Sequence, residues 1–335
     1  MNDLNETKEI ADGSLHPKQI TEKPEQKKLQ LPAPKPLKDR VWDFYSMHYK
    51  PLMLLPLIVF LLSLGIVGFH YMATGDIITK DVSLKGGATI TIPLENTIDI
   101  PSFEHSLSAL MLPHEIIVRE FGTPGKTQGI IVSADININN KEEINTLLSA
   151  ISSLGITLKE GEYGIEFFGS SLGSSFFKES LTAILVAFVL IMLVIFAYFR
   201  TFIPSIAIIL KAVGVMLVAL AFIDFFHIPI GTAGIAAFLM LIGYSVDTDI
   251  LLTIRVLKRK EGTLDERIAS SIKTGTTQTA IAFLAMAIGF GMAQSEIIRQ
   301  IMLILMVGLA ADPIFTWIQN VGMLRYYLEK KEKPQ

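Results

Sequence analysis

The residues of this 335-residue chain that could best carry out chemistry are ionisable side chains inside long apolar stretches. A charged group in the middle of a membrane helix costs about 2.5–3.5 kcal/mol, so it needs a partner or a function. A carboxyl group in a low-dielectric environment can take up and release a proton near neutral pH. We therefore predict a proton relay at the residues of this kind, which are Lys211, Asp247, Asp249 and Asp312.

The positions of these residues along their stretches predict how they pair. At about 1.5 Å per helical residue, Lys211 and Asp247 each lie about 12 Å from the same boundary, and they form an ion pair if their helices touch. Asp247 and Asp249 point about 200° apart, so that one faces a partner and the other a water path. The alternative is a purely structural role as buried pairs, although one lysine cannot neutralise three aspartates. Asp224 and Arg255 rank lower, because they lie near enough to the ends of their stretches to reach the interface.

The elements that hold these residues are predicted to be membrane helices. The chain is 50% hydrophobic and 18% charged, and its mean hydropathy is +0.48. About 20 apolar helical residues cross a bilayer core. Six stretches of suitable length are present, near residues 51–71, 179–199, 203–223, 229–254, 276–293 and 297–326.

Basic residues near the ends of the stretches predict the orientation of the chain. They are concentrated before the first stretch, in the 255–275 segment and after the last stretch, which predicts that these parts are cytoplasmic. The chain is thus expected to be a multi-pass protein of the cell membrane with both termini in the cytoplasm. Residues 1–40 are polar and rich in lysine and proline, which favours a flexible tail. Membrane helices two to six are assigned to residues 179–328.

The segment between the first two stretches, residues 72–178, is long enough for a small domain on the outer side. Ile90 and Ile92 alternate with polar neighbours, as in a half-buried strand. Asn140 followed by Glu143 resembles a capping box that opens a helix. The order of the expected elements is β-α-β-β-α-β, which is that of a ferredoxin-like fold. The predicted fold class is therefore an α+β membrane protein, with six transmembrane helices and one ferredoxin-like extracytoplasmic domain.

Several classes of function are disfavoured by the sequence. Cysteine is absent, which excludes disulfides, thiolate metal sites and a cysteine nucleophile. The net charge of −3 does not favour nucleic-acid binding, and the six histidines lack metal-ligand spacing. The Gly125–Thr127 segment lacks the upstream glycine of a phosphate loop, and the Gly169–Gly173 segment lacks the context of a hydrolase elbow. We expect no enzymatic activity, no metal and no cofactor.

The residues around the paired aspartates carry a family resemblance. The segment Gly243-Tyr244-Ser245-Val246-Asp247-Thr248-Asp249, followed by Arg255, resembles the G-Y-S-(L/V) segment and downstream arginine of the SecF family. Gly86 and Gly87 resemble its G-G-(T/A) signature, and Gly169–Gly173 its G-x-x-x-G entry segment. The match covers about residues 41–328. Where bacterial members read N-D-T, this chain reads Asp247-Thr248-Asp249, which is similar to the archaeal branch.

The resemblance implies an accessory subunit of Sec protein export that works with SecD beside a SecY-type channel. The translocating polypeptide and membrane lipid would be its other contacts, and the proton gradient its energy source. Asp247 and Asp249 would carry the proton, with Arg255 as an orienting residue. Two rivals stay open, namely a proton-coupled small-substrate exporter of the RND-like type and a purely structural subunit.

Overall fold

The structure is a computed structural model that describes residues 37–94, 98–123, 126–158, 161–259 and 261–332. The chain divides into two units, residues 1–43 and 44–335, and each is described by itself. The flexible tail expected over residues 1–40 lies, up to residue 36, outside the described residues. The described part of the first unit belongs to helix α1 (Leu37–Met47), which the sequence analysis did not anticipate.

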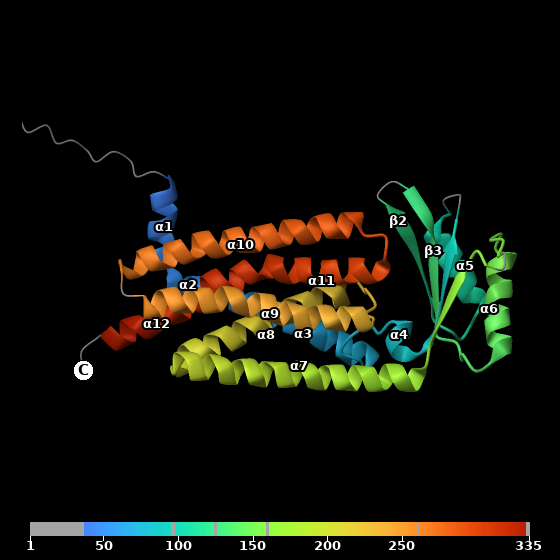
Figure 1. Ribbon diagram of the computed structural model, residues 1–335, viewed down its shortest axis with the longest axis horizontal. Helices are drawn as coiled ribbons and strands as arrows, with labels where there is room; N and C mark the ends of the chain where they lie inside the picture. Colours follow the sequence, from blue (N-terminus) through green and yellow to red (C-terminus); the bar gives the residue numbers. More distant parts are fainter. Residues whose placement is uncertain (1–36, 95–97, 124–125, 159–160, 260, 333–335) are drawn as a thin grey trace, which may run out of the picture. The chain divides into compact units, whose positions relative to one another are not determined.

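In the described part of the chain, six helical segments are long and apolar enough to cross a membrane, which confirms the predicted number (Figure 1). The first combines α2 (Tyr49–Leu52) and α3 (Leu54–Thr74). The next two are α7 (Ser170–Phe199) and α8 (Phe202–Phe225). The fourth is α9 (Thr232–Thr253) with the π-helical turn η1 (Ile254–Lys258), and the fifth is α10 (Leu264–Met292). The sixth joins α11 (Glu296–Pro313), the π-helical segment η2 (Ile314–Asn320) and α12 (Val321–Glu332).

Two helices begin well before their predicted apolar stretches. Helix α7 begins at Ser170 rather than near residue 179, and α10 begins at Leu264 rather than near residue 276. A search for apolar stretches finds only the part of a helix suited to lipid, whereas backbone hydrogen bonding continues through polar turns. Thr263 and Glu266 form a reciprocal capping box that starts α10 in this polar region.

Three of the membrane helices form the inside of the bundle. The apolar windows of α8, α9 and the α11–α12 segment are 50%, 56% and 50% buried. Those of α3, α7 and α10 are only 17%, 11% and 11% buried, so these helices lie outside. Small residues permit close packing of the inner helices. All the ionisable residues predicted to matter, except Arg255 in η1, lie on the three inner helices.

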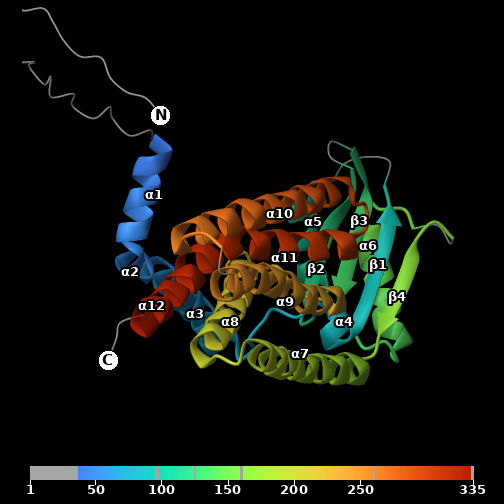
Figure 2. The ribbon, with the colours of Figure 1, turned by 60° about the vertical axis from the view of Figure 1, so that its left-hand side comes forward.

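The segment between α3 and α7 folds around a four-stranded antiparallel sheet (Figures 1 and 2). Its strands are β1 (Gly87–Pro93), β2 (Ile116–Thr123), β3 (Lys126–Ala134) and β4 (Gly164–Phe168), in the spatial order β2-β3-β1-β4. Helices α5 (Ile100–Leu110) and α6 (Lys141–Ser153) cover one face of the sheet. The short helix α4 (Val82–Lys85) precedes β1.

Alternation along β1 produces the two faces of this sheet domain. Ile90 and Ile92 are buried against Leu107 of α5 and Leu147 of α6, as the period of two requires. Asn140 caps α6, but the arrangement is not the reciprocal box that the sequence suggested. Its side chain accepts the N–H of Glu142, while the Glu143 carboxylate accepts the N–H of Asn137, three residues further upstream.

Two glycines occupy the joint between the sheet domain and the membrane helices. Gly86 and Gly87 have φ angles of +96° and +140°, which L side chains rarely adopt. A Cβ atom on Gly86 would lie 2.5 Å from the Cα of Ser170, and one on Gly87 would lie 2.2 Å from the carbonyl oxygen of Ala134. Glycine at position 86 therefore lets β1 start directly against the beginning of α7, and glycine at position 87 lets β1 lie close to the end of β3.

An arginine adds an electrostatic contact at the same joint. The guanidinium of Arg119, on β2, lies 3.8 Å from the Asp81 carboxylate before α4 and 3.6 Å from the Glu296 carboxylate at the start of α11. These contacts link the sheet domain to the end of the inner helix α11.

Candidate functional site

The centre of the site is a lysine that is fully buried among the three inner helices. Lys211 of α8 has no exposed surface. Its Nζ lies 3.1 Å from Oδ2 of Asp249 on α9 and 2.5 Å from Oδ1 of Asp312 on α11. It also donates a hydrogen bond of 2.5 Å to the carbonyl oxygen of Ser245. One ammonium group thus joins all three helices.

Two polar side chains of η2 complete this cluster. The Asn320 amide donates to Oδ1 of Asp249 at 2.7 Å, and the Thr316 hydroxyl donates to Oδ2 of Asp312 at 3.1 Å. We define the Lys211 cluster as Lys211, Ser245, Asp249, Asp312, Thr316 and Asn320. The sequence analysis missed Thr316 and Asn320, although their spacing of four and eight residues after Asp312 is a signal that could have revealed them.

A local departure from α-helical geometry helps to place these two residues. Pro313 has no N–H to donate, which disrupts the regular hydrogen-bonding pattern of a helix. The π-helical segment η2 begins at the next residue. Such segments are often found at functional sites, because they alter the direction of the side chains that follow. Here Thr316 and Asn320 both reach the carboxylates of the cluster.

The net charge of the cluster depends on a single proton. One ammonium and two carboxylates carry a net charge of −1 when all three are ionised, whereas one bound proton makes the cluster neutral. Lys211 and Asp249 are fully buried and Asp312 is 2% exposed. Unpaired charge is costly in such an environment, so the binding of one proton would remove an unpaired negative charge from between the three helices. The side chains of the cluster are closed to solvent.

The predicted ion pair between Lys211 and Asp247 is wrong. Asp247 is exposed on the opposite side of α9, whereas Asp249 is the aspartate that contacts Lys211. The number of residues from the helix end gives the depth of a side chain along the helix. It contains no information on the direction of that side chain around the helix axis. The expectation that the two aspartates face different surroundings agrees with their burial.

The exposed side of α9 forms a continuous stripe that includes Asp247. Gly243 and Tyr244, two residues of the family-like segment, lie on it, whereas Ser245 belongs to the buried side. We define the α9 stripe as Ala236, Met240, Gly243, Tyr244 and Asp247, all of which are exposed. Within the described residues no hydrogen bond or ion pair of Asp247 is found. A charged residue on such a surface needs water or a protein partner.

Arg255 lies apart from the Lys211 cluster. Its guanidinium donates to the carbonyl and hydroxyl oxygens of Ser270, at 2.9 and 3.2 Å, and to the hydroxyl of Thr274, at 2.9 Å. Both partners are on α10. Arg255 therefore attaches the π-helical turn η1 to α10 at one end of the bundle, and it touches neither aspartate.

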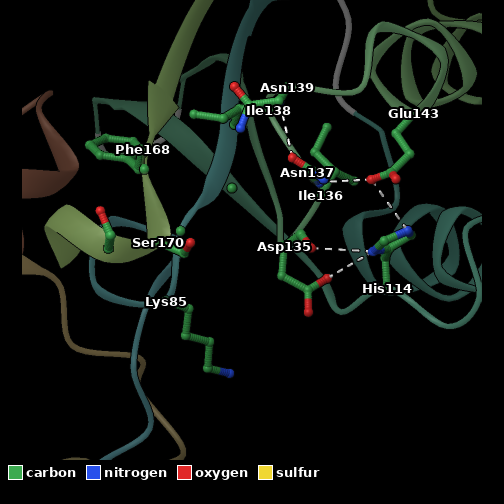
Figure 3. A pocket seen from close by; sticks show the side chains of 14 residues that line it. Lys85, His114, Asp135, Ile136, Asn137, Ile138, Asn139, Glu143, Phe168 and Ser170 are labelled. Atoms are coloured by element: carbon green, nitrogen blue, oxygen red, sulfur yellow. Dashed lines mark hydrogen bonds and ion pairs between the residues drawn. The ribbon is translucent and has the colours of Figure 1, made fainter. Parts of the chain in front are cut away.

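A second polar cluster lies in the sheet domain, beside a cavity of about 700 Å³ (Figure 3). We call it the His114 cluster, made of His114, Asp135 and Glu143. The Nδ1 atom of His114 lies 3.5 Å from the Asp135 carboxylate, and Nε2 lies 3.8 Å from that of Glu143. The pKa of Glu143 lies below its usual value, because the Asn137 N–H donates to the carboxylate and the Asn140 amide and His114 charge add to this effect. Among the described residues, no group of three or more ionisable ligands is arranged to hold a metal ion.

Comparisons with known proteins show which family this chain is similar to. Residues 154–330 match the protein family described as protein export membrane protein SecD/SecF, C-terminal. The chain is 32% identical to SecF of Pyrococcus furiosus over 297 residues, which are 88% of this chain and 97% of that relative. It is 33% identical to SecF of Methanocaldococcus jannaschii over 290 residues, 84% of this chain and 96% of the relative.

A solved structure has a similar fold. The crystal structure of SecDF from Thermus thermophilus, a translocon-associated membrane protein, matches with a TM-score of 0.65 at 17% identity. The match covers 90% of this chain and 40% of the SecDF chain, so this chain spans less than half the length of that protein.

Proposed function

The chain belongs to the SecD/SecF family of protein-export membrane proteins, and on that premise we propose that it is a multi-pass membrane subunit that assists Sec protein export together with a SecD-type subunit. The SecF relatives and the SecDF fold support the export role. The single observation that carries the mechanism is the Lys211 cluster, in which two carboxylates compete for one buried ammonium.

The proposed mechanism uses proton binding to change how the inner helices are joined. When Asp249 or Asp312 gains a proton, Lys211 pairs with the other carboxylate alone. Thr316 and Asn320 then transmit the change, because each is bonded to one of the two aspartates. Proton flow would draw on about 2.3 kcal/mol per charge for each 100 mV across the membrane. The solvent-closed cluster corresponds to an occluded state between openings to either side.

The α9 stripe supports the need for a membrane partner. Its small residues Ala236 and Gly243 allow another helix to approach closely, and Asp247 provides a charge for that helix to neutralise. The fact that this chain matches 40% of the SecDF chain agrees with a partner that supplies the remaining portion. We propose that a SecD-type subunit covers the stripe, and that a SecY-type channel and the translocating polypeptide meet the assembled pair.

The sheet domain is proposed to be ferredoxin-like and to lie on the outer side of the membrane. Its element order and the strand order β2-β3-β1-β4 support the fold. The distribution of basic residues supports the orientation, with both termini in the cytoplasm. Through the contact of Arg119 with Glu296 this domain is joined to α11, which carries Asp312 of the Lys211 cluster, so movement of α11 would be transmitted to it.

A structural role is the second candidate, and the complete burial of Lys211 and Asp249 is the observation that favours it. Proton flux measured in liposomes that contain this protein with a SecD-type subunit separates the two functions. We expect Asp249→Asn and Asp312→Asn to reduce flux to the level of empty liposomes, while Glu261→Gln, at an exposed position shortly before α10, keeps it. Unchanged flux in both aspartate variants would leave only the structural role.

A further inference from the structure

A buried aspartate outside the Lys211 cluster has no polar partner. Asp224, one residue before the end of α8, is 2% exposed, and neither of its carboxylate oxygens has a hydrogen-bond partner among the described residues. A carboxylate at this position also faces the negative end of the helix dipole. Both the burial and the dipole disfavour a charged carboxylate.

Two imidazoles lie around this carboxyl group. His70, in the last turns of α3, is 7% exposed, and its Nε2 atom has no hydrogen-bond partner either. His227 follows α8 in the connection to α9, with a φ of 51°, and its N–H donates to the Asp224 carbonyl oxygen at 3.1 Å. The two rings are 6.5 Å apart. Of the described residues, these histidines are the titratable groups whose charges act on Asp224.

This group of residues is distinct from the Lys211 cluster. Asp224 and Lys211 are thirteen residues apart on α8, which corresponds to about 20 Å along the axis and about 220° around it. Asp224 lies at the end of the bundle that bears the sheet domain, since Ile230, in the next connection, pairs with Lys80 before α4. Helix α3, which carries His70, packs against α8.

We propose that His70, Asp224 and His227 form a proton-binding site at the sheet-bearing end of the bundle, separate from the Lys211 cluster. The Asp224 carboxyl holds the proton while α3 and α8 are packed together, because no donor among the described residues reaches either of its oxygens. His227 is exposed, and it gives this carboxyl a path to water. Loss of the proton leaves a buried carboxylate without a donor, so the contact between α3 and α8 weakens as the pH rises.

Thermal unfolding of the full chain in lipid nanodiscs tests the site. As the pH is raised from about 6 to about 9, the unfolding temperature of the unaltered protein is expected to fall by about 2–4 °C more than that of Asp224→Asn. The amide resembles the protonated carboxyl but cannot lose a proton. Asp76→Asn, near the same end, is the matched control and should follow the unaltered protein, because this carboxylate is half-exposed and already paired with Lys80.

A second variant, Asp224→Leu, removes the carboxyl without leaving a polar group, and it should show the same reduced pH dependence. The proposal is overturned if both Asp224 variants keep the full pH dependence, because Asp224 then exchanges no proton in this range. It is also overturned if Zn²⁺ raises the unfolding temperature of the unaltered protein but not of Asp224→Asn, since the site would then hold a metal ion.

Discussion

The Lys211 cluster and the His114 cluster combine the same kinds of groups, a basic side chain between two carboxylates, in opposite surroundings. The first is closed to water, with side-chain exposures of 0% for Lys211 and Asp249 and 3% for Asp312. In the second, His114, Asp135 and Glu143 keep 27%, 35% and 27%. Similar groups therefore have very different surroundings in the two places.

The difference shows that burial strengthens the electrostatic interaction between charged groups. Two unit charges 4 Å apart attract by about 1 kcal/mol in water and by about 4 kcal/mol at an effective dielectric constant near 20. Water and salt therefore reduce the effect of a proton on the His114 cluster. In the Lys211 cluster no water or salt screens the charge that a proton adds, so the surrounding protein groups alone must compensate for it. Substitutions in the two clusters should accordingly differ in their effect on stability.

Removal of the cation from the buried cluster should have the largest effect. Lys211→Met leaves two carboxylates without their partner, and we expect a loss of about 3–5 kcal/mol of stability or a failure to accumulate. Thermal unfolding in nanodiscs measures the loss. His114→Gln in the sheet domain is the matched change and should cost less than about 1 kcal/mol. Equal effects of the two substitutions would remove the contrast between the clusters.

Neutralising the carboxylates should restore much of that loss. In the triple variant Lys211→Met, Asp249→Asn, Asp312→Asn no charge is left in the Lys211 cluster. A mutant cycle should therefore show a coupling energy of about 1–3 kcal/mol among these sites. Additive effects would show that the three charges do not act as a unit.

Loss of the hydrogen bonds from η2 should have the next largest effect on stability. Asn320→Leu removes the donor to Asp249, and Thr316→Val removes the donor to Asp312. Each should cost about 1–3 kcal/mol, because a buried carboxylate oxygen loses its hydrogen bond. Thr276→Val, on the exposed side of α10, is the control and should be nearly neutral.

The smallest effect is expected at Glu143, and it should depend on pH. Folding lowers the pKa of this carboxyl from its ordinary value of 4.5. The unfolded chain therefore takes up the proton first as the pH falls, so the stabilising contribution is present above pH 4.5 and lost as the pH falls through the folded pKa. Glu143→Gln should unfold at a lower temperature than the unaltered protein near pH 7, and the difference should disappear in strong acid. A difference that persists in acid would show that the charge of Glu143 is irrelevant.

Hydropathy was sufficient to find the membrane helices, and alternation was sufficient for β1, because both patterns are local. Helix ends were less predictable: the polar turns at the start of α7 and α10 have no apolar signal. The candidate site was found in part. Lys211, Asp249 and Asp312 were recognised by the cost of charge in an apolar stretch, whereas Thr316 and Asn320, which are neutral, carried no such warning.

Residue types and their order along the chain established that ionisable groups lie within the membrane helices and need partners there, because the free energy of transferring a side chain into the membrane depends on its type. Which groups meet was decided by the packing of α8, α9 and α11 and by the π-helical segment after Pro313. Asp247 and Asp249 are residues of the same type on the same helix, yet their different directions around the helix axis place the first on the exposed side and the second against Lys211. That direction depends on long-range contacts between helices, which no short stretch of sequence contains.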